Sequence, residues 1–84
     1  MLTVDRTIEQ EVIRIISRTK KIKADRLQSN ARLEKDFGFD TVDVVDIILQ
    51  LEKNFQIVIP DEAPMQTISD VIEAVETCAM RNAG

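Results

Sequence analysis

The sequence lacks histidine, tryptophan and tyrosine, and it holds one cysteine, two glycines and two prolines in 84 residues. Without histidine, Ser-His and Cys-His nucleophilic catalysis is excluded, and a single cysteine also excludes the common zinc sites. These absences argue against an enzyme. One cysteine cannot form an intramolecular disulfide, which favours a reducing compartment, and we expect a cytoplasmic protein. Few glycines and prolines leave little turn chemistry for a sheet of many strands, so helices are favoured.

The charge is divided unevenly along the chain, although its sum is only −4. Residues 1–35 hold nine Lys and Arg against five acids, a net charge of +4, whereas residues 36–84 hold two against ten, a net charge of −8. A negative surface over the second part argues against nucleic acid and for a basic protein partner. No apolar run reaches the ~20 residues of a membrane span, so we expect no membrane association.

Three segments carry the apolar spacing of helices, and the chain length fits one domain over residues 1–84. The first helix is expected over 7–20, with Thr7 and Gln10 as a capping box. The second is expected over 41–54 behind Asp40 as N-cap, and the last begins at Thr67. The expected buried faces are Ile8, Val12, Ile15 and Ile16; Val42, Val45, Ile48, Leu51 and Phe55; and Ile68, Val71, Ile72 and Val75, with Val44, Ile47 and Leu49 as apolar residues off the second face.

The segments between these helices show weaker patterns. Residues 21–39 lack a sustained helical period, so we expect a long loop that Leu27, Leu33 and Phe37 pin to the core. Residues 61–66 are expected to form at most a brief helix, because proline limits anything longer. The sequence therefore predicts an all-α fold, a small irregular four-helix bundle. It has three main helices plus a short third helix, and a long loop joins helices one and two.

The start of the second helix combines acidic side chains with a lone hydroxyl. Asp36, Asp40, Asp43 and Asp46 lack the alternating spacing and central glycine of an EF-hand loop, so we expect no metal site. The Thr41 hydroxyl would lie near unpaired backbone N–H groups and the positive end of the helix dipole. A modifying enzyme could reach such a position. The simpler interpretation is a helix-start residue that only helps to cap the helix.

The run LEKDFGFDTVDVVDIILQLEKNF from Leu33 to Phe55, followed by IVIPDE at 57–62, resembles the acyl carrier protein family. That family is marked by leucine, two polar residues, aspartate, leucine, glycine, any residue and Asp-Ser-Leu, then by a helix ending Leu-Glu-x-x-Phe. The match is continuous, and TISDVI at 67–72 resembles the start of the family's last helix. With the first helix included, the resemblance covers nearly the whole chain.

The resemblance implies a module that carries acyl intermediates as thioesters on 4'-phosphopantetheine, in fatty-acid or specialised lipid or polyketide biosynthesis, without catalysing a reaction. The family's attachment serine is matched by Thr41, and Val42 replaces the next leucine. Threonine keeps the hydroxyl, but its β-methyl group crowds the oxygen and restricts χ1. The resemblance further implies that Asp40 caps the helix and steers the modifying enzyme.

Three interpretations of the threonine stay open. A tolerant or dedicated synthase modifies it; or the chain is a carrier-like protein-interaction module without phosphopantetheine; or threonine replaces a natural serine and locks the apo form.

The resemblance also implies a surface for partner enzymes on the second helix. Its acids match positions that meet basic patches on a carrier protein synthase, a ketosynthase or an acyl ligase-type enzyme, and they are Asp40, Asp43, Asp46 and Glu52. Apolar contacts to partners are implied at Val42, Ile47, Leu49 and Ile59, of which Leu49 and Ile59 also fit an ordinary core. We expect a monomer.

Overall fold

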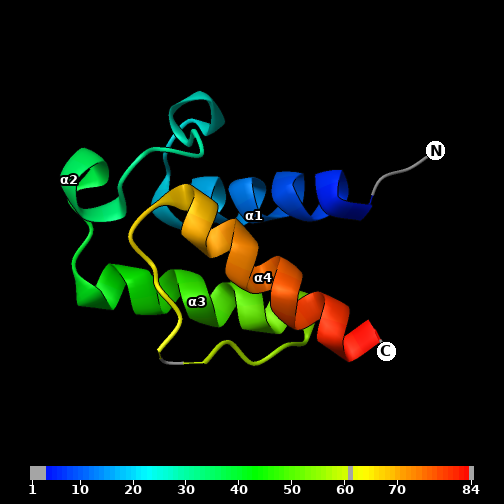
Figure 1. The fold of residues 1–84 in the computed structure, drawn as a ribbon. Coiled ribbons are helices and arrows are strands. Elements are labelled where there is room, and N and C mark those ends of the chain that lie inside the picture. The colour runs from blue at the N-terminus through cyan, green and yellow to red at the C-terminus, as the bar shows by residue number, and fades with distance from the viewer. Residues whose placement is uncertain (1–3, 61, 84) are drawn as a thin grey trace.

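Three long helices form the body of the molecule. The computed structural model describes residues 4–60 and 62–83, with side chains described over 8–60 and 62–79. The long helices are α1 (Val4–Lys20), α3 (Thr41–Phe55) and α4 (Ile68–Ala83). A 3-10 turn, η1 (Ala24–Arg26), and a short helix, α2 (Leu33–Phe37), lie between α1 and α3. Figure 1 shows α1 and α3 running in opposite directions, with α4 crossing them obliquely.

The core lies where α1 packs against both α3 and α4. Every buried side chain among the described residues is apolar, and most of them are Ile, Leu or Val. The predicted buried faces of the first and last helices are confirmed, because all eight of their residues are buried. The all-α class with four α-helices is likewise confirmed for the described residues. No helix in the described ranges combines the length and apolarity needed to cross a bilayer.

The predicted start of the first helix is wrong. α1 begins at Val4, three residues before Thr7, so the expected capping box at Thr7 falls inside the helix. The physical reason is that residues 4–6 contain neither glycine nor proline, and nothing in them stops the helix from extending towards the N-terminus.

The segment between α1 and α3 is more ordered than the loop that the sequence predicts. Leu27 and Leu33 are buried as expected and Phe37 is half-buried, but residues 33–37 form helix α2. The Asp36 carboxylate accepts the backbone N–H of Arg32 at 2.6 Å, which satisfies one donor at the start of this helix. A five-residue helix is too short to show a helical period in its apolar residues. The capping residues at its ends are then the remaining indication of the helix in the sequence.

The start of α4 is tied to the chain just before α2. The Leu33 N–H donates to the Gln66 carbonyl at 2.9 Å, and the Ile68 N–H donates to the Ala31 carbonyl at 3.0 Å. The brief helix expected at 61–66 is not observed, since described residues 62–66 form a turn, bends and irregular chain, and residue 61 lies outside the described residues. The short helix of the bundle is therefore the second in chain order rather than the third.

The predicted cap of α4 is confirmed. The Asp70 N–H donates to Thr67 Oγ1 at 3.1 Å, and the Thr67 N–H donates to Asp70 Oδ2 at 3.2 Å. These two hydrogen bonds form a reciprocal capping box, which satisfies two backbone donors at the helix start.

The buried face of α3 agrees with the predicted one at Ile48, Leu51 and Phe55, and it differs nearer the helix start. Val42 is 72% exposed and Val45 is 46% exposed, whereas Ile47 and Leu51 are fully buried. Val44, Ile48 and Phe55 are half-buried and pack against the core. Residues 44, 47, 48, 51 and 55 also follow helical spacing, so α3 carries two adjacent apolar stripes, and spacing alone could not select between them.

Candidate functional site

Thr41 is the first residue of α3, and its side chain is exposed. Its hydroxyl forms no hydrogen bond with any residue that the structure describes. The approach to this position is set by Gly38, which has a φ of 71° in the left-handed region that glycine occupies without strain. Phe39 then turns inward and is buried, and Asp40 is extended. The chain thus leaves α2 sharply and presents Thr41 to solvent.

A groove of about 560 Å³ opens beside Thr41. Its lining includes the buried side chains of Leu33 and Phe39, together with Met65 and Gln66 of the segment before α4. The complete lining is Arg32, Leu33, Glu34, Lys35, Phe39, Asp40, Thr41, Val44, Val45, Met65 and Gln66. Sequence reasoning did not assign Arg32, Lys35, Met65 or Gln66 to the site, because the groove forms only when α2 and residues 65–66 meet α3.

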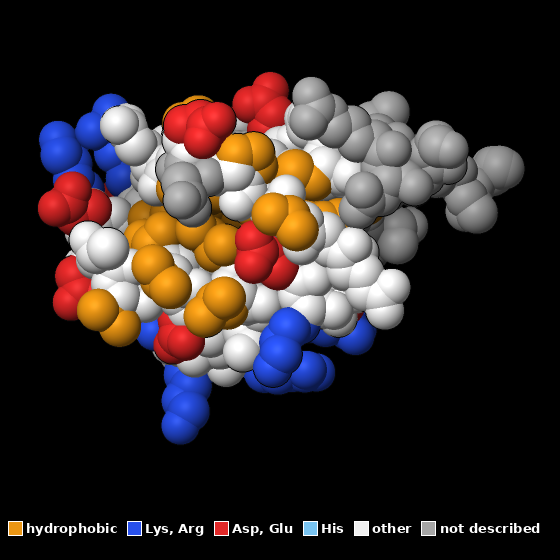
Figure 2. All heavy atoms as spheres, turned by 90° about the horizontal axis from the view of Figure 1, so that it is seen from below, with side chains coloured by type: hydrophobic (Ala, Val, Ile, Leu, Met, Phe, Trp, Pro, Cys, Tyr) orange, Lys and Arg blue, Asp and Glu red, His pale blue; other side chains and the backbone are white. Residues whose placement is uncertain are grey.

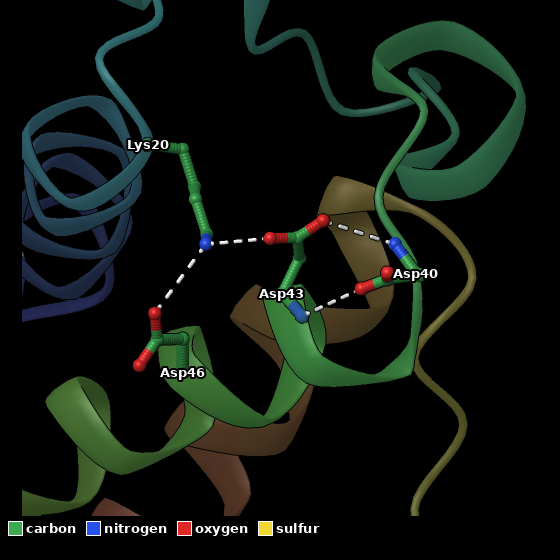
Figure 3. Close-up of polar contacts among 4 residues, drawn as sticks. All are labelled: Lys20, Asp40, Asp43 and Asp46. Carbon is green, nitrogen blue, oxygen red and sulfur yellow. Dashed lines mark hydrogen bonds and ion pairs between the residues drawn. The ribbon is translucent and has the colours of Figure 1, made fainter.

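Asp40 and Asp43 form a reciprocal capping box at the start of α3 (Figure 3). The Asp43 N–H donates to Asp40 Oδ1 at 3.1 Å, and the Asp40 N–H donates to Asp43 Oδ2 at 3.1 Å. The predicted capping role of Asp40 is therefore observed. The box holds the turn that carries Thr41 in one geometry.

A lysine from the end of α1 reaches across to the acids of α3. Lys20 Nζ lies 2.7 Å from Asp43 Oδ1 and 3.4 Å from Asp46 Oδ2 (Figure 3). The hydrogen bond to Asp43 raises the pKa of the Lys20 ammonium above its ordinary value of 10.5. The same bond, together with the backbone N–H of Asp40, lowers the pKa of Asp43 below its ordinary value of 3.8. No local pattern predicts this contact, because Lys20 lies 23 residues from Asp43 and 26 residues from Asp46.

Replacing Lys20 with methionine is expected to lower stability in a pH-dependent way. The pKa of Asp43 is lowered on folding, so its contribution is present above its unfolded value of 3.8 and is lost as pH falls through the folded value. The pKa of Lys20 is raised, so its contribution is present below 10.5 and is lost as pH rises through the folded value. Urea unfolding at a series of pH values measures the free energy of unfolding of K20M and of the unchanged chain. The difference between the two free energies should be constant from about pH 5 to 9 and should become smaller at both extremes. If the difference in free energy of unfolding were the same at pH 2 and pH 7, the ion pair between Lys20 and Asp43 would be contradicted.

Two of the predicted apolar partner residues lie on the surface of α3. Val42 and Leu49 are 72% and 51% exposed. Two further exposed apolar residues, Val45 on α3 and Val58 in the segment after it, were not among the predicted partner contacts. Figure 2 shows apolar side chains gathered on this face of the molecule, over α3 and the segment that follows. We call Val42, Val45, Leu49 and Val58 the apolar face.

The other two predicted apolar contacts lie in the core. Ile47 and Ile59 are 1% and 4% exposed, so the structure gives neither side chain a surface to offer to a partner. Ile47 points inward because the stripe that contains it packs against α1 and α4. Glu52, one of the predicted docking acids, is half-buried, and its Oε2 accepts the Ile59 N–H at 2.9 Å. That carboxylate therefore holds the segment after α3 against the helix.

Comparison with known proteins gives the family. The family described as the phosphopantetheine attachment site matches residues 10–75. The acyl carrier protein of Akkermansia muciniphila is 32% identical over 74 residues, which are 86% of this chain and 92% of that protein. The chain belongs to the acyl carrier protein family. The acyl carrier protein of Prochlorococcus marinus is also 32% identical, over 71 residues that are 82% of this chain and 89% of that protein.

A solved structure agrees with the acyl carrier protein fold. The solution structure of the apo doublet acyl carrier protein from prodigiosin biosynthesis superposes with a TM-score of 0.75 at 23% identity. The match covers 87% of this chain and 36% of that doublet chain. At this identity the likeness concerns the fold alone.

Membership of the acyl carrier protein family supports an acyl carrier role in biosynthesis and implies a 4'-phosphopantetheine prosthetic group. Proteins of this family interact with biosynthetic enzymes and are in general carriers rather than catalysts. The residues present fit such a group, since Thr41 is exposed and its hydroxyl has no hydrogen-bond partner among the described residues. The groove beside it gives a flexible arm room to lie along the surface.

Proposed function

We propose that this chain carries acyl intermediates on a 4'-phosphopantetheine group attached to Oγ1 of Thr41. The observation that carries the proposal is the exposed Thr41 hydroxyl at the first turn of α3, within a chain of the acyl carrier protein family. When bound, the group supplies a terminal thiol that holds the acyl chain as a thioester. Asp40 and the capping box hold the turn that presents the hydroxyl.

The proposed docking surface combines the apolar face with the acids beside it. Asp40, Asp43 and Asp46 would meet basic patches on a carrier protein synthase, a ketosynthase or an acyl ligase-type enzyme. Val42 and Leu49 would supply apolar contact next to them, since both are exposed on the same helix. Such charge complementarity increases the association rate and the specificity more than the affinity. In this proposal the chain is a non-catalytic, monomeric, single-domain carrier over residues 1–84 that works in the cytoplasm.

The decisive experiment is an intact-mass measurement after co-expression with several carrier protein synthases. The expected result is a mass increase of one phosphopantetheine, located on the peptide that contains Thr41. If the protein stayed unmodified with every synthase, the proposal of a covalent carrier would be contradicted. In that case the chain would be a docking module without a prosthetic group.

A further inference from the structure

We propose that Lys20 is a specificity-determining residue that competes with partner cations for the acids of the docking surface. The inference rests on the proposed function, because it concerns the surface to which partner enzymes would bind. It goes further in assigning a role to a residue of α1, outside the helix that bears the attachment residue.

Each oxygen of the Asp43 carboxylate already accepts one hydrogen bond within the protein. Oδ1 bonds the Lys20 ammonium at 2.7 Å, and Oδ2 accepts the Asp40 N–H at 3.1 Å. The Lys20 side chain is only 16% exposed, so it is held against the protein rather than extended into solvent. A partner cation therefore meets Asp43 already bonded on both sides.

The neighbouring acids keep free oxygens. Asp46 is 53% exposed, and only its Oδ2 faces Lys20, at the longer distance of 3.4 Å. Asp40 is exposed and uses Oδ1 in the capping box, so its Oδ2 has no hydrogen-bond partner among the described residues. Each of these two carboxylates can accept one hydrogen bond from a partner without displacing Lys20.

This arrangement discriminates between basic partners. A bidentate arginine contact uses both oxygens of one carboxylate, so at Asp43 it must share them with the capping N–H and with the Lys20 ammonium, whose positive charge repels the guanidinium. A partner with cations spaced for Asp40 and Asp46 binds without that cost. Lys20 also cancels one of the three negative charges on this surface, which lowers the attraction for any basic protein at low salt. A carboxylate that is already paired with Lys20 attracts some basic partners less than others. Such a difference in affinity between partners is specificity.

The test compares two substitutions that change the net charge equally. K20M removes the ammonium and keeps an unbranched apolar side chain, which frees Asp43 Oδ1 and Asp46 Oδ2. K23M is the matched control, because Lys23 is exposed and forms no ion pair with the described residues. The probe is a penta-arginine peptide, whose affinity for each variant is measured by titration calorimetry at 20 mM and 300 mM salt.

We expect K20M to bind the peptide about two- to fivefold more tightly than K23M at low salt, the range that exposed ion pairs contribute. The advantage should shrink at high salt, since surface charges are then screened. Adding D43N to K20M should remove most of the gain in affinity for the peptide. A merely structural role of Lys20 would not predict that loss. Circular dichroism confirms that each variant is folded before the comparison.

Equal affinities of K20M and K23M would overturn the proposal, and so would a gain that persists in the K20M/D43N double variant. The peptide needs neither a prosthetic group nor a carrier protein synthase. Its result is therefore independent of the intact-mass experiment, and a failure of either proposal can be told apart from a failure of the other.

Discussion

Replacing Thr41 with alanine is expected to abolish the mass increase that a carrier protein synthase produces. Alanine lacks the oxygen that would bond to phosphorus, and the loss should be complete rather than partial. Thr41 is exposed and its hydroxyl has no described hydrogen-bond partner, so the stability of T41A should stay within about 0.5 kcal/mol of the unchanged chain. Intact-mass spectra and urea unfolding of the same preparation check both statements.

The serine variant at the same position is the matched control. T41S keeps the oxygen and removes the β-methyl group that restricts χ1. Relief of an unfavourable rotamer of ~1 kcal/mol corresponds to modification about fivefold faster. A time course of mass increase with one synthase measures the ratio. If T41A still gained the group, another hydroxyl would be the attachment site, and the assignment of Thr41 would be wrong.

Replacing Ile47 with alanine is expected to destabilise the protein by about 2–4 kcal/mol, the cost of removing a large aliphatic side chain from a packed core. Ile47 is 1% exposed, and it lies in the stripe of α3 that packs against α1 and α4. In a domain of this size each kcal/mol lowers Tm by about 4–8 °C, so the melting temperature should fall by roughly 10 °C or more. Thermal and urea unfolding measure the change.

V42A, on the other stripe of the same helix, is the control for Ile47. Val42 is 72% exposed, and alanine has a higher helix propensity than valine, so V42A should be neutral or slightly stabilising. The two expectations reverse what the sequence pattern alone predicts, because that pattern places Val42 in the core and Ile47 off the buried face. Equal losses of stability would contradict the observed orientation of α3.

The sequence alone was enough for the features that depend on neighbours along the chain. The buried stripes of α1 and α4 follow from helical spacing, and the caps at Asp40 and Thr67 follow from residues three positions apart. The likeness around Thr41 to the acyl carrier protein signature is equally local, and the comparisons confirm the family. Each of these signals lies in one continuous stretch of the chain and depends on residues close together in the sequence.

Only the tertiary structure decided the features that depend on how the helices pack. α3 has two apolar stripes of acceptable spacing, and contact with α1 and α4 selects the one containing Ile47, which leaves Val42 exposed. The bond from Lys20 to Asp43 joins residues 23 positions apart, so no local pattern records it. The physical reason is the same in both cases. Helical spacing determines which residues share a face, whereas the orientation of one helix against another determines which face is buried and which charges meet.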